Sequence, residues 1–296
     1  MDSLALELES KRVLLPNGWS LSPAGKSLPL GDLPLNIVAS PDGKLMAVTN
    51  NGQSKQSLML IDADQEVILD ETKIGKSWYG LAFDKTGTKL YASGGNDNRI
   101  LIYDIRENRL VKSDSIVLGK PWPENKISPT GIALDDKRKR LYITTKEDSA
   151  LYIADLTNHT AKKIALGHEA YNCLLSPDQG RLYISLWGGH QVVVIDTENQ
   201  KLIQSISVGS NPNDLVLTRD GKYLFVSHGN DNSVSVIETA SGKVLEVLNT
   251  ALYPQSLLGS TPNAVALSEN EERLYIANAD NNCLAVFDNI EPFLIF

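Results

Sequence analysis

Aromatic and imidazole side chains recur in the segments between the apolar runs of this 296-residue chain. Rings accompanied by amides and imidazoles are typical of a site that binds a small molecule, a sugar or a peptide. The candidate ligand-binding residues in these segments are Trp78, Tyr79, Trp122, Tyr171, Asn172, Trp187, His190, Asn213, His228 and Asn263.

Metal binding is a weaker interpretation of the histidines. His190 and His228 would need a third ligand, which Asp231, Glu169 or Asp214 could supply. No histidine lies three or four residues from another, so the spacing favours loop histidines that face solvent. The Asn-Asp-rich strings at 96–98, 230–232 and 280–282 resemble calcium-ligand strings, but Asn and Asp also suit the left-handed backbone of hairpin turns. We expect neither a metal nor another cofactor.

The sequence contains no motif of nucleophilic catalysis. It has no Gly-x-Ser-x-Gly elbow, no zinc-protease helix and no phosphate-binding Gly-Lys-Ser/Thr loop. The two cysteines, Cys173 and Cys283, start apolar runs and read as small buried side chains rather than as a metal motif. We therefore assign no catalytic residue, and the sequence leans away from an enzyme.

A repeat of 41 to 51 residues must position the candidate residues. A Leu followed by Tyr, Phe or Met recurs at positions 45, 90, 141, 182, 224 and 274, often directly after a turn such as Pro41-Asp42-Gly43. An apolar run that ends in an acid follows each time, at Asp62, Asp104, Asp155, Asp196, Glu238 and Asp288. Each unit reads as four short strands, which is the pattern of a β-propeller blade. The repeated acids are expected to accept backbone N–H groups of the following turns.

Propeller topology brings distant candidate residues together. The loops between blades lie at the same end of the disc as the loops between the second and third strands of each blade. The aromatic and imidazole residues are therefore expected to converge on one face. That face is predicted to bind a small molecule, a glycan or a partner protein domain.

The repeat resembles the YVTN-repeat family of β-propellers over roughly residues 11–290, as in Leu182-Tyr183-Ile184-Ser185 followed by Val192-Val193-Val194-Ile195-Asp196. The run from Pro16 to Gly25, with Leu30-Gly31, resembles the start of bacterial proteins in which such a propeller precedes an alkaline-phosphatase-like phosphoesterase domain. That domain and its metal ligands are not in this sequence, so no phosphatase activity is expected. The resemblance implies a periplasmic or extracellular location, although no signal peptide begins the chain.

Two other functions remain open at this point. Some related propellers are lactone hydrolases, for which His190, His228 and Asp214 would be the candidate residues. A purely structural repeat of a cell-surface protein is the third interpretation.

The repeat divides the chain into an N-terminal extension, residues 1–10, and one all-β propeller, residues 11–296. We expect the seven-bladed type, with six clear repeats plus strands within residues 12–31. A six-bladed closure, in which Leu28 to Gly31 pairs with the last blade, is the alternative. Only eight residues follow Asp288, so we expect a C-terminal truncation that leaves the last blade incomplete.

Composition limits the partners. The 28 Lys and Arg residues against 36 Asp and Glu give a net charge of −8, which disfavours nucleic acid because phosphate contacts need a basic surface. No apolar run reaches the roughly 20 residues that span a bilayer. We expect a monomer.

Overall fold

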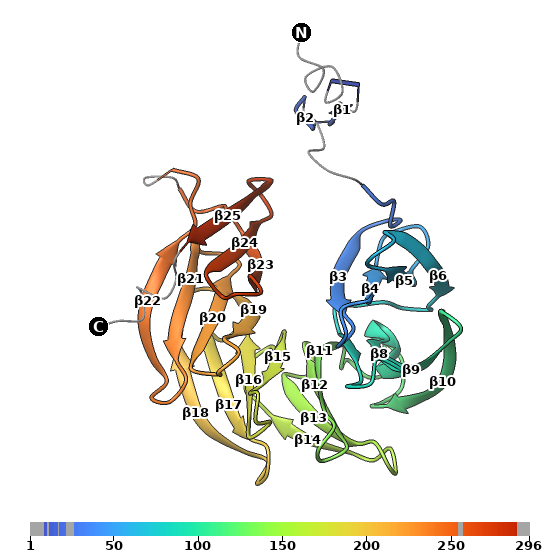
Figure 1. Ribbon diagram of the computed structural model, residues 1–296. Helices are drawn as coiled ribbons and strands as arrows, with labels where there is room; N and C mark the ends of the chain where they lie inside the picture. Colours follow the sequence, from blue (N-terminus) through green and yellow to red (C-terminus); the bar gives the residue numbers. More distant parts are fainter. Residues whose placement is uncertain (1–8, 11, 17, 22–26, 254–256, 289–296) are drawn as a thin grey trace.

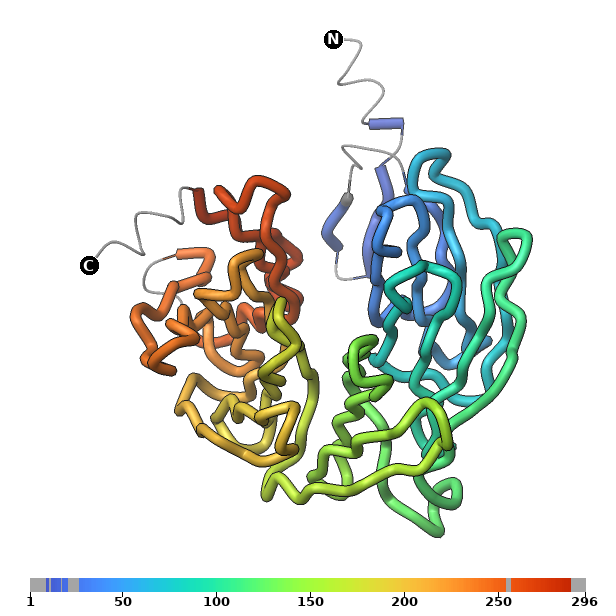
Figure 2. The backbone as a smooth tube through the Cα atoms, turned by 60° about the horizontal axis from the view of Figure 1, so that its bottom comes forward, coloured from blue at the N-terminus to red at the C-terminus, as the bar shows by residue number. Residues whose placement is uncertain are grey.

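The computed structural model describes residues 9–10, 12–16, 18–21, 27–253 and 257–288. Six antiparallel sheets follow one another along the chain and lie side by side in an arc (Figures 1 and 2). Blade 1 contains β3 (Pro34–Ala39), β4 (Leu45–Asn50), β5 (Ser57–Asp62) and β6 (Val67–Lys73). Blade 2 contains β7 (Leu81–Phe83), β8 (Lys89–Ser93), β9 (Arg99–Arg106) and β10 (Arg109–Val117), with the 3₁₀ turn η1 (Gly95–Asp97).

The other four blades repeat this order. Blade 3 contains β11 (Pro129–Asp135), β12 (Arg140–Thr145), β13 (Ala150–Asp155) and β14 (Ala161–Ala165). Blade 4 contains β15 (Cys173–Leu175), β16 (Arg181–Leu186), β17 (Gln191–Asp196) and β18 (Lys201–Ser207). Blade 5 contains β19 (Pro212–Leu217), β20 (Tyr223–His228), β21 (Ser233–Glu238) and β22 (Lys243–Asn249). Blade 6 has three strands in the described part of the chain, β23 (Pro262–Leu267), β24 (Arg273–Asn278) and β25 (Cys283–Asp288).

Blades 2 to 5 are each held between two neighbours because both faces of their middle strands are apolar. In β17, Val193 and Ile195 pack toward blade 3, whereas Val192 and Val194 pack toward blade 5. Successive side chains of a strand point to opposite faces, so one apolar run serves two inter-blade cores. Five such cores join the six blades in sequence. The all-β propeller predicted from the repeat is therefore present.

The expectation of seven blades is wrong, because the structure has six. In the N-terminal region, Val13–Leu14 (β1) and Ser20–Leu21 (β2) form a two-stranded sheet of their own that joins no blade. Leu28 and Leu30 lie in no strand, and they pack against Val48, Met59 and Ile61 of blade 1 rather than pairing with the last blade. Of residues 12–31, which were expected to add strands to a further blade, 17 and 22–26 lie outside the described residues, and Leu28 and Leu30 cover an apolar face instead.

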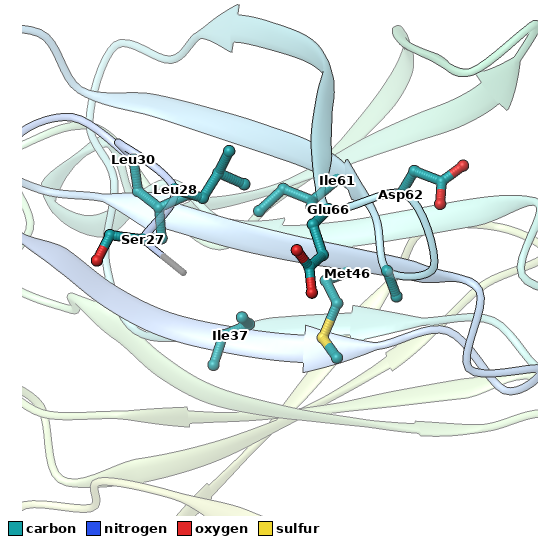
Figure 3. Close-up of a pocket in the computed structure, with 9 residues that line it drawn as sticks. Ser27, Leu28, Leu30, Ile37, Met46, Ile61, Asp62 and Glu66 are labelled. Atoms are coloured by element: carbon teal, nitrogen blue, oxygen red, sulfur yellow. The ribbon is translucent and has the colours of Figure 1, made fainter. Parts of the chain in front are cut away.

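The outer face of blade 1 carries an apolar groove of about 470 Å³, which we call the edge groove. Figure 3 shows its lining, with Asp62 and Glu66 at the end opposite Ser27. Its apolar side chains are Leu28, Leu30, Ile37, Met46, Ile61 and Ala63. The outward face of blade 6 is likewise uncovered, since Leu284 and Val286 are 58% and 47% exposed.

The repeated acids make two kinds of contact, and only one of them is in a turn. Asp62, Asp155 and Asp196 each accept a backbone N–H two or three residues further on, as expected. Asp104 and Asp288 instead form ion pairs, Asp104 with Lys89 and Arg106 and Asp288 with Arg273. No helix in the described part of the chain is long and apolar enough to cross a membrane.

Candidate functional site

Loops and inner strands of blades 2 to 6 enclose a cavity of about 170 Å³, which we call the central cavity. Five of its lining residues were predicted as ligand-binding from the sequence: Trp78, Tyr171, Trp187, Asn213 and Asn263. Lys146 and Ala170 complete it. The loop topology of the propeller thus brings together side chains from positions 78 to 263 of the chain.

The lining residues occupy repeated positions of the blades. Trp78 and Tyr171 lie in loops that lead into β7 and β15, and Asn213 and Asn263 are the second residues of β19 and β23. These four strands are the first of their sheets, and the first strands line the inner side of the arc (Figure 1).

Lys146 and Trp187 form the wall contributed by the second strands. Each directly follows its strand, β12 or β16, so the two residues are equivalent in adjacent blades. The Lys146 ammonium lies over the Trp187 ring, with Nζ 5.6 Å from the ring centroid. This distance is within the range of a cation–π interaction.

Tyr79 and Asp214 connect opposite parts of the arc beside the cavity. The Tyr79 hydroxyl donates to Asp214 Oδ1 at 3.1 Å, and Asn172 Nδ2 donates to the same oxygen at 3.0 Å. The Val265 amide donates to Asp214 Oδ2 at 3.0 Å, which brings blade 6 into the network. The rings of Tyr79 and Tyr171 lie 5.0 Å apart, centroid to centroid.

Burial sets the acid–base properties of this network. Loss of hydration raises the pKa of Asp214, while its hydrogen bonds act in the opposite direction. Burial and the neighbouring Asp214 charge raise the pKa of Tyr79. They also raise the pKa of Tyr171 to about 12. The tyrosines therefore remain neutral at ordinary pH, and the network acts as a fixed support.

Asn213 holds the cavity wall in place. Its side chain is 4% exposed, and its Nδ2 donates to the Pro262 carbonyl at 3.1 Å and to Asn263 Oδ1 at 3.2 Å. Its Oδ1 accepts the Asp214 amide at 2.8 Å. With these bonds made, Asn213 fixes the orientation of Asn263, whose side chain is exposed.

The structure places the two candidate histidines in different environments. His190 is exposed in a turn with φ of 52°. His228 is fully buried at the end of β20, where its Nε2 accepts the Gly209 amide at 3.2 Å and its Nδ1 lies 2.9 Å from Ser233 Oγ. Nε2 accepts, so the neutral ring carries its proton on Nδ1 and donates it to Ser233. Burial lowers the pKa of His228 to about 4.

The remaining predicted residues lie outside the central cavity lining. Trp122 is 41% exposed and lies beneath Lys126, whose Nζ is 4.9 Å from the ring centroid. Asn172 and Tyr79 belong to the supporting network described above. Within the described residues, no group of three or more histidines, cysteines or acids is arranged to hold a metal ion. Cys173 is buried, as the sequence predicts, and Cys283 is partly buried.

Sequence reasoning missed Lys146, although the repeat contains the signal that finds it. In blades 3 and 4, the residue that directly follows the second strand lines the cavity. In blade 3 this residue is Lys146, and in blade 4 it is Trp187. The repeat also explains His228. The last residue of the second strand is buried in every blade, as Asn50, Ser93, Thr145, Leu186, His228 and Asn278.

Comparisons with known proteins agree with this architecture. No family model matches the chain. The uncharacterised protein YncE of Salmonella typhimurium is 25% identical over 197 residues, which are 66% of this chain and 54% of that protein. The chain therefore spans about half the length of the curated relatives it matches. It is a β-propeller with YncE-like homologues.

Solved structures share the fold. Hydrazine synthase from Kuenenia stuttgartiensis aligns with a TM-score of 0.73 and 21% identity, over 91% of this chain and 81% of that one. A Lactobacillus plantarum protein aligns with a TM-score of 0.69 and 14% identity, over 86% of this chain and 80% of that one. At these identities the likeness concerns the fold alone.

Proposed function

We propose that this protein is a non-catalytic binding module that takes a small ligand in the central cavity. The observation that carries the proposal is the convergence of Trp78, Tyr171 and Trp187, with two asparagines and a lysine, from five blades onto one cavity. Aromatic walls with a few fixed polar groups are the usual lining of a ligand pocket. The network centred on Asp214 holds the loops rigid, which lowers the entropy cost of binding.

The volume favours a small ligand. About 170 Å³ is below the roughly 300–1,000 Å³ of pockets for drug-sized molecules. A lactone hydrolase built on His190, His228 and Asp214 has less support, because both ring nitrogens of His228 are engaged by Gly209 and Ser233. Association with a phosphoesterase domain, and a location outside the cytoplasm, stay predictions that the DNA flanking this reading frame would test.

The four tryptophans provide a direct test. Protein labelled with 5-fluorotryptophan should give a ¹⁹F signal for each of Trp19, Trp78, Trp122 and Trp187, assigned with single Trp→Phe variants. In a screen of small compounds, binders should shift the Trp78 and Trp187 signals together and leave those of Trp19 and Trp122 in place. The proposal fails if no compound does so, or if the shifts concentrate at the two exposed tryptophans.

A further inference from the structure

The charge of the central cavity lining selects among small ligands. Of its seven residues, Lys146 is the single cation and none is an acid. Within the described part of the chain, no carboxylate forms a salt bridge with Lys146, whereas Lys55, Lys89, Lys120, Lys163 and Lys222 each form one. What distinguishes Lys146 is its fixed place over the Trp187 ring in the cavity wall. The lining therefore presents one positive charge to a ligand in a molecule with a net charge of −8.

Three aromatic rings would otherwise suit a cationic ligand. A cage of Trp and Tyr faces attracts ammonium groups through the ring quadrupoles. Here the Lys146 ammonium already lies over Trp187, and a second cation in the same small cavity would meet its repulsion. The cavity is thus disfavoured for a cation and favoured for an anionic group beside the lysine.

The size and the aromatic lining of the cavity indicate the apolar part of the ligand. A dry cavity of about 150 Å³ holds one benzene ring, and the central cavity measures about 170 Å³. Ring faces of Trp and Tyr provide stacking for a planar body, as aromatic pairs prefer. The amides of Asn213 and Asn263 add polar atoms at the same space.

We propose that the central cavity binds a small carboxylate with a single aromatic or heteroaromatic ring, its carboxylate at Lys146 and its ring among Trp78, Tyr171 and Trp187. This inference rests on the proposed function and specifies its ligand. Nothing in the proposal requires a chemical step, because the cavity holds the ligand by charge and stacking alone.

The test compares three single-ring compounds of similar size, benzoate, benzamide and benzylammonium, by isothermal titration calorimetry and by the ¹⁹F signals of Trp78 and Trp187. We expect benzoate to bind about tenfold more tightly than benzamide, the difference of a charge-assisted contact, and benzylammonium to bind most weakly. Benzoate binding should weaken as NaCl is raised, since salt screens the contact.

Two matched lysine variants locate the effect. Lys146→Met should weaken benzoate about tenfold, leave benzamide within twofold and strengthen benzylammonium. Lys126→Met removes a lysine that lies over a different tryptophan, Trp122, and should change none of the three affinities. Unchanged thermal unfolding of both variants shows that they are folded.

The outcomes separate this inference from the proposed function. Equal affinity for benzoate and benzamide, or a benzoate preference that survives in Lys146→Met, overturns the carboxylate assignment. Tightest binding of benzylammonium overturns it in favour of a cation cage. If other compounds shift the Trp78 and Trp187 signals but benzoate does not, the binding site stands and this ligand class is wrong. If no compound shifts them, both proposals fail.

Discussion

The central cavity and the edge groove are both lined by apolar side chains, but they differ in how they arise. The edge groove is the larger, about 470 Å³ against 170 Å³, yet one blade and residues 27–30 make all of it. Ile37 in this groove is 55% exposed, whereas Ile132 and Leu215, at the same register in blades 3 and 5, are 7% and 6% exposed against the preceding blade. The edge groove is thus a packing face without a preceding blade.

The central cavity, in contrast, exists only because several blades meet. Its polar atoms are fixed by hydrogen bonds between blades 2, 4, 5 and 6, among them those of Asp214. The difference teaches that the larger hollow can be a mere packing face. Our proposal of the smaller cavity as the ligand site therefore rests on its convergent, supported polar and aromatic groups.

The largest difference in stability between the two regions should appear when a carboxylate of each is removed. Asp214→Ala removes the acceptor of three donors, the Tyr79 hydroxyl, the Asn172 amide and the Val265 N–H. Leaving buried donors unpaired should lower the free energy of unfolding by about 4 kcal/mol. Asp62→Ala at the edge groove removes turn bonds near solvent and should cost about 1 kcal/mol or less. Urea unfolding of the two variants measures the difference, and equal losses would contradict the supporting role of Asp214.

Acid should lower the stability of the protein through protonation of His228, which supports the wall of the central cavity. Its pKa is about 4 in the folded protein against 6.5 as the ordinary value, so the unfolded chain binds the proton first. Stability conferred by the neutral ring is complete above pH 6.5 and is lost as pH falls toward 4, by up to about 3 kcal/mol. The ring holds Gly209, and Asn211 of the same loop donates to the Trp187 carbonyl at 3.1 Å.

Unfolding curves at several pH values isolate this effect. The stability difference between wild type and His228→Gln should shrink as pH falls from 6.5 to 4, whereas His190→Gln, at an exposed position, should follow the wild type throughout. A pH-independent difference for His228→Gln would show that its titration does not support the wall.

A smaller effect on stability, but a specific one on binding, is expected from the cavity wall itself. Trp187 is partly buried, so Trp187→Ala should cost about 1–2 kcal/mol and weaken ligand binding at least tenfold. Ile37→Ala in the edge groove should cost about 0.5 kcal/mol or less and leave binding unchanged. Calorimetric titration with benzoate, alongside thermal unfolding, checks both. Weaker benzoate binding in Ile37→Ala would show that the ligand binds in the edge groove and not in the central cavity.

Much of the fold was predictable because each repeat contains the local sequence pattern of its strands and turns. Strand order and turns follow from alternating apolar residues and, in some turns, from an Asn where the backbone is left-handed, as at Asn98 and Asn282. Blade number was not predictable, because short apolar pieces such as Leu28 to Leu30 can pair as a strand or cover a face, and their sequence does not distinguish the two. Burial of His228 follows from its position in the repeat, but the bond from the Gly209 amide to its ring joins two segments, and periodicity alone does not reveal that contact.

The most direct test of the account is hydrogen–deuterium exchange of the full chain with and without saturating benzoate. We predict that bound benzoate slows exchange in the loops around Trp78, at residues 170–172 and 186–188, and at 211–213. We predict no change at residues 27–31, 45–47 and 60–66 of the edge groove. Protection confined to the edge groove, or no protection in either region, would contradict the claim that the central cavity is the ligand site.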